Sequence, residues 1–157
     1  MQYFTDLLER LGRTPDDSVT ICYQSSVQRF MAKTIKVSMA ESTISALDSL
    51  DNNVWFEINP STVNGRATAQ DITALAALYI DIDYKDSGAG TIAQAKELID
   101  LLSDLIGVGP SVVVYSGHGI QPYWAIDPEE DFDPVLAQGI LNRWGAFARF
   151  IGGSIGV

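Results

Sequence analysis

The sequence predicts a mixed α/β (α+β) fold in which helices cover a sheet. Segments with strand periodicity alternate with segments of helical periodicity along the 157 residues, which is typical of helix-covered sheets. The hydrophobic fraction of 46% is that of an ordinary globular protein, and the length suffices to bury a core. Because no linker, repeat or low-complexity segment interrupts the pattern, we expect a single domain over residues 1–157.

The first part of the chain predicts two helices and three strands. Apolar residues recur at helical spacing near the N-terminus and again in a segment with Ile44, Leu47 and Leu50 on one face. Between and after them lie β-rich segments, the last of which places Val54 and Phe56 inward and Trp55 outward. The predicted elements are helices at residues 3–11 and 40–50 and strands at 18–23, 31–38 and 53–59.

The second part predicts further strands and helices. A loop over 61–68 and a short helix over 69–76 are expected to lead into a strand that ends at Asp83. Thr91 is the predicted N-cap of the following helix, whose apolar face we expect to contain Ile92, Leu98, Ile99, Leu102 and Leu105. The other predicted elements are strands at 111–116 and 121–126, a turn at 117–119 and a helix over 134–151.

The composition excludes several classes of protein. No apolar run reaches the length of a membrane span, and the N-terminus lacks the layout of a signal peptide. The single cysteine, Cys22, excludes both a disulfide framework and a cysteine zinc site within one chain. We therefore expect a cytoplasmic protein with no membrane partner. The net charge of −10 argues mildly against general nucleic-acid binding, although the acidic loop at 127–133 carries much of it.

An apolar stretch over residues 74–83 ends in two carboxylates. In a strand its side chains alternate between two faces: Leu78, Ile80 and Ile82 on one, and Tyr79, Asp81 and Asp83 on the other. Two acids on one face repel each other unless a cation lies between them, and Mg²⁺ prefers such hard oxygen ligands. The pair predicts a divalent-metal site; the alternative is a strand that simply enters an acidic surface loop.

The only histidine, His118, lies in the turn Ser116-Gly117-His118-Gly119. Glycines on both sides allow the backbone to approach a ligand closely. The side chains of Ser116 and His118, together with the N–H groups of the turn, can donate hydrogen bonds to a phosphate. The alternative is a hairpin turn that carries an exposed histidine.

Other polar residues flank the acidic stretch. Asn59 and Arg66 precede it and Lys85 follows it. Arg66 is suited to bidentate phosphate binding and Lys85 to a single phosphate contact, although both can equally be ordinary surface residues. Two carboxylates for metals and one histidine for phosphate suit nucleotidyl transfer from a triphosphate. The sequence contains neither a Walker A motif nor a serine–histidine–acid arrangement, which argues against a P-loop ATPase and against acyl hydrolysis. Tyr123 can stack on a base, whereas Trp124 fits the core better.

Three segments together resemble a known family. They are Val54–Pro60 with Gly65-Arg66, Leu78–Asp83, and Val114–Trp124. They resemble the primase-polymerase (Prim-Pol) domain of the archaeo-eukaryotic primase superfamily, which occurs in phage and plasmid replication proteins, and are most like versions from phages of actinobacteria. The resemblance covers about residues 54–126 well and the first fifty residues loosely.

The resemblance implies a DNA primase and DNA polymerase in one active site, built on an RRM-like sheet with an N-terminal α/β module. It implies that Asp81 and Asp83 bind catalytic Mg²⁺ or Mn²⁺, and that His118 is catalytic. The nucleotide-binding residues it implies are Ser116, Gly117, His118, Gly119, Arg66, Asn59 and Lys85. The implied partners are nucleoside triphosphates, a single-stranded DNA template and a C-terminal helicase domain, in a bacterial host cytoplasm if the chain is phage-encoded.

The family has a third metal-binding acid after the helix that we predict to end near Ile151. Asp127 and Asp133 both precede that helix, so neither is well placed to replace it. We therefore expect a chain truncated at its C-terminus, whose activity on its own is open. The alternative functions are a non-catalytic module that binds nucleotides or single-stranded DNA, and a metal-dependent nuclease.

Overall fold

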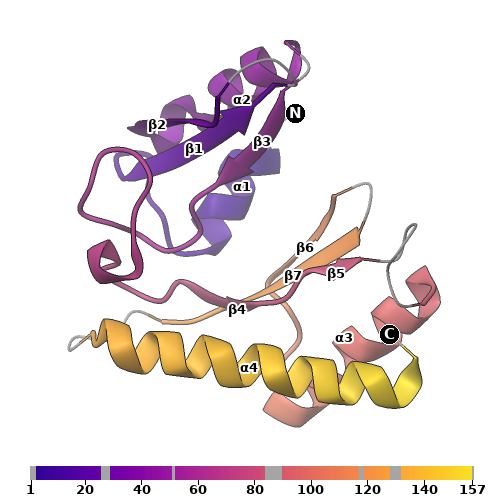
Figure 1. Ribbon diagram of the computed structural model, residues 1–157. Helices are drawn as coiled ribbons and strands as arrows, with labels where there is room; N and C mark the ends of the chain where they lie inside the picture. The colour runs from indigo at the N-terminus through magenta and orange to yellow at the C-terminus, as the bar shows by residue number, and fades with distance from the viewer. Residues whose placement is uncertain are drawn as a thin grey trace. The chain divides into compact units, whose positions relative to one another are not determined.

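Two antiparallel sheets, each packed against helices, form the fold, so the predicted mixed α+β class is confirmed (Figure 1). The computed structural model describes residues 3–25, 29–50, 52–83, 90–116, 119–127 and 132–156. The contacts divide the chain into an N-terminal unit, residues 1–76 with 127–134, and a second unit, residues 77–126 with 135–157. Each unit has its own hydrophobic core.

The N-terminal unit contains a sheet of three strands in the order β2-β1-β3. Its elements are α1 (Tyr3–Arg10), β1 (Ser18–Gln24), β2 (Met31–Lys36), the 3-10 turn η1 (Val37–Met39), α2 (Ala40–Asp48) and β3 (Asn53–Phe56). The two helices pack on one face of the sheet, where Leu8, Val19 and Ile21 are fully buried. The helical spacing and strand alternation read from the sequence therefore identify the core side correctly for these elements.

Two predictions in this unit are wrong. Leu50 is 69% exposed, because α2 ends at Asp48 and Leu50 follows in a turn. The helix predicted over 69–76 is only the 3-10 turn η2 (Ala69–Asp71). The residues after it instead bond back to the start of the loop: the Thr73 N–H donates to the Pro60 carbonyl at 2.9 Å. Once the backbone makes these longer-range bonds, it cannot also make helical ones.

The second unit has β7 as its central strand. Its elements are β4 (Ala77–Tyr79), β5 (Ile82–Asp83), α3 (Ile92–Ile106), β6 (Val112–Tyr115), β7 (Gly119–Ala125) and α4 (Pro134–Ile155). β6 pairs with one side of β7, and β4 and β5 pair with the other side, all antiparallel. The hairpin predicted from the sequence is therefore confirmed, and its second strand is the element on which the other strands of this sheet assemble.

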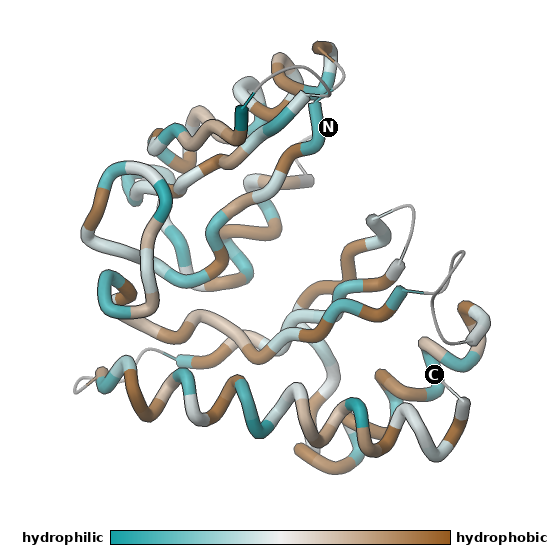
Figure 2. The backbone as a smooth tube through the Cα atoms, viewed as in Figure 1, coloured by the Kyte–Doolittle hydropathy of each residue, from teal (hydrophilic) through white to brown (hydrophobic). Residues whose placement is uncertain are grey.

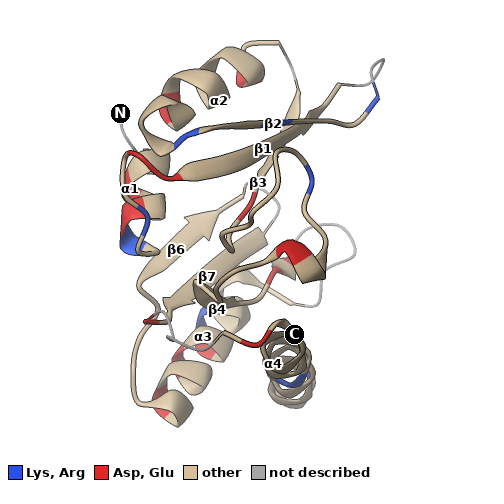
Figure 3. Ribbon diagram, turned by 90° about the vertical axis from the view of Figure 1, so that its left-hand side faces the viewer, with Lys and Arg blue, Asp and Glu red and all other residues tan. Residues whose placement is uncertain are grey.

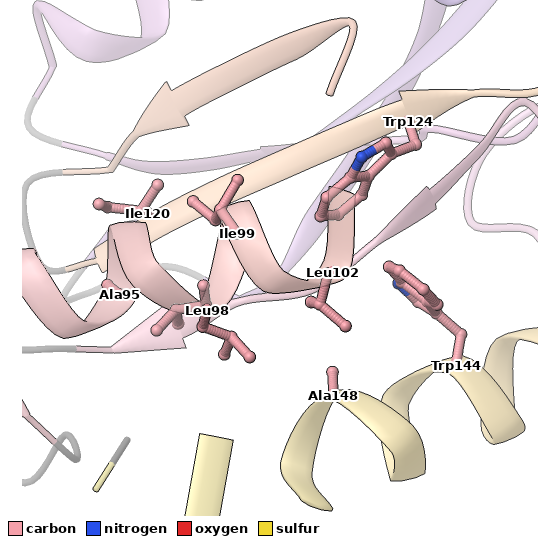
Figure 4. Packing of buried hydrophobic residues seen from close by; sticks show 9 residues of the cluster. Ala95, Leu98, Ile99, Leu102, Ile120, Trp124, Trp144 and Ala148 are labelled. Carbon is pink, nitrogen blue, oxygen red and sulfur yellow. The ribbon is translucent and has the colours of Figure 1, made fainter. Parts of the chain in front are cut away.

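Helices α3 and α4 cover one face of this sheet (Figure 4). Trp124 from β7 meets Trp144 from α4 edge to face, with ring centroids 5.2 Å apart. Leu102 from α3 is fully buried beside them. The apolar face predicted for α3 is too long, because Ile92 and Leu105 near the two ends of the helix are 43% and 59% exposed. Only the middle turns of the helix lie over the sheet.

The ends of α3 and α4 are joined by a side-chain bond. The predicted cap is confirmed: the Thr91 hydroxyl accepts a hydrogen bond from the Gln94 N–H at 3.3 Å. The Gln94 amide in turn donates to the Ile155 carbonyl at 2.8 Å. α4 runs past Ile151, where the sequence predicts its end, because Ile151 and Ile155 still pack on the core. A few hydrophilic residues are interspersed among the hydrophobic ones of α4 (Figure 2).

Candidate functional site

The strand that bears the two acids has the predicted two faces. Leu78, Ile80 and Ile82 pack into the core of the second unit. Asp81 and Asp83 are exposed on the opposite face. The period of two along a strand therefore separates the carboxylates from the apolar core, as the sequence predicts.

The strand is interrupted beside Asp81. β4 ends at Tyr79 and β5 begins at Ile82, although both keep one register against β7, in which Ile80 would face Pro122. The carbonyls of Gly119 and Tyr123 accept bonds on the β6 side, so by alternation the backbone of Pro122 is directed toward β4 and β5. Proline has no N–H to donate, and the ladder breaks where that donor is missing.

Asp81 is held by a chain of two hydrogen bonds. The Gln121 amide donates to Asp81 Oδ1 at 3.2 Å, and the Tyr123 hydroxyl donates to Gln121 Oε1 at 3.1 Å. Tyr79 stacks on Tyr123 with ring centroids 6.0 Å apart. Burial, followed by the charge of the Asp81 carboxylate and by Tyr79, raises the pKa of Tyr123 to about 12. The phenol therefore stays protonated and remains a donor at neutral pH.

Asp83 lies beside Gly119, the residue that follows His118 in the sequence. It pairs with Gly119 in the register of β5 with β7. A Cβ on Gly119 would lie 2.5 Å from the Ile82 carbonyl oxygen, so this close approach of the strands requires glycine. The Ser116 hydroxyl accepts a bond from the Gly119 N–H at 3.0 Å and closes the turn. Ser116 and Gly119 thus both have structural roles next to the acid.

Some predicted residues lie outside the described residues. They are Gly117 and His118 in the turn and Lys85 after β5. The predictions made for them stay predictions. The structure describes the two flanking residues, Ser116 and Gly119, and pairs Asp83 with Gly119.

Within the described ranges, no group of three or more His, Cys, Asp or Glu residues could hold an ion. Asp81 and Asp83 are two exposed carboxylates on one strand face, which fits part of a Mg²⁺ or Mn²⁺ site completed by water and phosphate oxygens. Two carboxylates suit a metal site whose other ligands come from the substrate and water better than a structural site closed by protein ligands.

Asn59 and Arg66 belong to the N-terminal unit. Asn59 Oδ1 accepts a hydrogen bond from the Ala76 N–H at 2.9 Å and so joins the two ends of the loop between them. The guanidinium carbon of Arg66 lies 5.5 Å from the centre of the Phe30 ring. Asn59 therefore has a structural partner, while Arg66 lies at the surface of its own unit.

Sequence reasoning missed Gln121 and Tyr123 as neighbours of Asp81. The signal was the alternation in β7, where Ile120 and Trp124 face the core and Gln121 and Tyr123 must face the other way. Only the register of β7 against β4 and β5 identifies Asp81 as their partner.

Comparisons with protein-family models, curated proteins and solved structures return no match to this chain. Within the part of the chain that the structure describes, no helix is both long and apolar enough to cross a membrane.

Proposed function

We propose that this chain carries the metal-binding and nucleotide-binding part of a primase-polymerase, which makes and extends primers by template-directed nucleotidyl transfer. One observation supports this most directly: Asp83 pairs with Gly119, the residue that follows His118. Asp83 and Gly119 are far apart in sequence but adjacent in the sheet. A reaction that needs metal-binding carboxylates beside a phosphate-binding turn requires such an arrangement.

The order of elements in the second unit supports the RRM-like part of the proposal. Strand, helix, two strands and helix follow one another, with β7 between β6 and the interrupted strand β4–β5. This is the beginning of a β-α-β-β-α-β arrangement. In our proposal a further strand after α4 pairs with β4–β5, which among the described residues pair with β7 alone. That strand would carry the third acid beside Asp81 and Asp83.

The proposed chemistry assigns a role to each residue. Asp81 and Asp83 hold Mg²⁺ or Mn²⁺, which when bound neutralises charge on the transferring phosphoryl group. Ser116 and His118 orient the triphosphate. The 3′-hydroxyl oxygen of the primer then bonds to the α-phosphorus as the bond between the α- and β-phosphates breaks; pyrophosphate leaves and the hydroxyl proton passes to water. Gln121 holds one carboxylate oxygen of Asp81, which fixes the orientation of the other.

The test uses primer synthesis and extension on single-stranded DNA by a chain extended past Val157, with Mg²⁺ or Mn²⁺ and nucleoside triphosphates. Asp81→Asn and Asp83→Asn should each lower the rate at least about 100-fold, because a metal ligand is lost. Asp104→Asn, on the exposed side of α3, is the matched control and should leave the rate unchanged. Normal synthesis by Asp81→Asn would refute the metal assignment.

Two other measurements separate the alternatives. Mn²⁺ binding followed by electron paramagnetic resonance should weaken in Asp81→Asn and Asp83→Asn but not in Asp104→Asn. Nuclease activity would appear as cleavage of labelled DNA in Mn²⁺ without nucleotides. A module that only binds would retain nucleotides or DNA without synthesis, even in the extended chain.

A further inference from the structure

Two aromatic rings are exposed together on the N-terminal sheet. Trp55 is 46% exposed and Phe30 is 42% exposed, with ring centroids 5.7 Å apart and planes tilted by 40°. Val54 and Phe56 pack toward the helices, so Trp55 between them points to the opposite face of the sheet. By contrast, Trp124 and the third tryptophan, Trp144, are both buried. Trp55 is therefore the one tryptophan with an accessible ring.

Arg66 is fixed beside these rings by its loop. Gly65 adopts a φ of +101°, which favours glycine, and its N–H donates to the Thr34 hydroxyl at 2.7 Å. The Thr20 hydroxyl donates to the Gly65 carbonyl at 3.2 Å. These bonds attach the loop to the outer face of the sheet and place the Arg66 guanidinium over the Phe30 ring. The backbone next to Arg66 is therefore anchored to the sheet, while the guanidinium itself is exposed above the Phe30 ring.

A second arginine is next to Phe30 in the chain. Arg29 precedes Phe30 in the chain and is exposed. Figure 3 shows basic residues both in the segment before β2 and in the loop that follows β3. In the described residues the only ion pair joins Lys36 to Asp16, so neither of these arginines is in an ion pair with a described carboxylate. On a chain with a net charge of −10, this surface combines open rings with available cations.

We propose that this ring surface, defined as Phe30, Trp55, Arg29 and Arg66, binds single-stranded nucleic acid. A base stacks on the exposed Trp55 ring, and the two arginines contact neighbouring phosphates. Aromatic rings on the open face of a sheet are a recurring platform for unpaired bases, because every base has a π face. A protein partner would also cover the rings, but it would not need two available arginines beside them.

This inference does not depend on the proposed reaction, because it uses residues of the N-terminal unit alone. If both hold, the surface is a strand-binding contact additional to the metal site. Either proposal can fail without the other, since the metal site is tested at Asp81 and Asp83 and the ring surface at Trp55 and Arg66.

The first experiment uses intrinsic fluorescence of the 157-residue chain. Titration with a 15-nucleotide oligo-dT should quench tryptophan emission, because Trp55 is accessible and the other two tryptophans are not. A matched DNA duplex should quench little, since its bases are already stacked. Oligo-U tests whether RNA is bound as well. Two phosphate contacts predict a slope of log affinity against log salt of about −1.4.

The second experiment follows the anisotropy of labelled oligo-dT with variants of the full chain. Trp55→Ala should weaken binding by about 5- to 150-fold, the range for loss of one stacked base. Arg66→Ala should weaken binding and flatten the salt slope by about 0.7, whereas Arg66→Lys should keep the slope. Phe150→Ala and Arg149→Ala, exposed on α4, are the matched controls and should bind normally.

Several results would overturn the proposal. Equal affinity for duplex and single strand would exclude base stacking, and normal binding by Trp55→Ala would exclude this surface. No oligonucleotide binding, with self-association that Trp55→Ala abolishes in sedimentation, would identify the rings as a protein interface instead. Circular dichroism of each variant, matched to that of the parent chain, ensures that a loss of binding is not a loss of folding.

Discussion

Asp83 pairs with Gly119 across β5 and β7, at a point where the strands approach so closely that a Cβ on Gly119 would lie 2.5 Å from the Ile82 carbonyl oxygen. The same Cβ would lie 3.2 Å from a carboxylate oxygen of Asp83. The glycine next to the candidate histidine is thus required by the sheet, whether or not a ligand also approaches it. The position of Asp83 depends on that close approach.

We predict that Gly119→Ala destabilises the fold. The backbone of Ile82 is not a flexible group that can move aside, so the added methyl must separate β5 from β7, at a cost of about 1–3 kcal/mol. Urea unfolding followed by circular dichroism measures the change. Mn²⁺ binding should weaken as well, because Asp83 moves with β5.

The matched control is Gly139→Ala in α4. A Cβ at this position meets nothing within 4 Å, and alanine is the better helix former, so stability should rise by up to about 1 kcal/mol. If both variants lose stability equally, the close approach of the strands is not the cause.

Local patterns predicted most of the elements of this fold. The alternation over Leu78–Asp83 and the Thr91 cap depend only on neighbours in sequence, and the structure confirms both. The break beside Asp81 could not be predicted, because it depends on Pro122 facing this strand across the sheet. The register is a property of the assembled sheet and cannot be determined from the sequence of either strand alone.

Long-range contacts also explain why the helix predicted over 69–76 does not form. Its residues have acceptable helical character, but the loop instead closes on itself through bonds such as Asn59 with Ala76. In the candidate site, the sequence identifies Asp81 and Asp83 but not the support that Gln121 provides. That support is visible only after β7 has been paired with β4 and β5.

Tyr123 should titrate late, with a pKa raised to about 12. Its folded pKa is raised above the ordinary value of 10, so its contribution to stability is present below pH 10 and is lost as the pH rises towards 12. Phenolate absorbance during alkaline titration measures this, with circular dichroism to detect unfolding. Tyr123→Phe should remove the late step.

The Asp81 carboxylate contributes to that shift, so Asp81→Asn should lower the pKa of Tyr123. This readout needs neither metal nor nucleotide and tests the geometry of the candidate site directly. An unchanged titration in Asp81→Asn would mean that the carboxylate does not lie near the phenol. Asp104→Asn again serves as the control for a surface charge removed elsewhere.

We predict that Asn59 has a structural role in closing its loop. Asn59→Ala removes the acceptor for the Ala76 N–H and should lower the free energy of unfolding by about 1 kcal/mol. Asn59→Asp keeps an oxygen at that position and should retain most of the stability. Urea midpoints of the two variants decide the question. If Asn59→Ala unfolds at the midpoint of the parent chain, the residue is free for another role.

Cys22 reports on Arg66 at the ring surface. Burial raises the pKa of this thiol, the nearby Arg66 charge opposes the shift, and Glu57 adds to it. Because the thiolate is the reactive form, Arg66→Ala should slow the reaction with a thiol reagent at pH 8, and Glu57→Gln should accelerate it. The chain has one cysteine, so the rate needs no correction for others.

Arg149→Ala is the control. Opposite changes in Arg66→Ala and Glu57→Gln would establish that both charges act on the thiol, whereas equal rates in all variants would place Arg66 away from Cys22 and from the rings that it is proposed to serve.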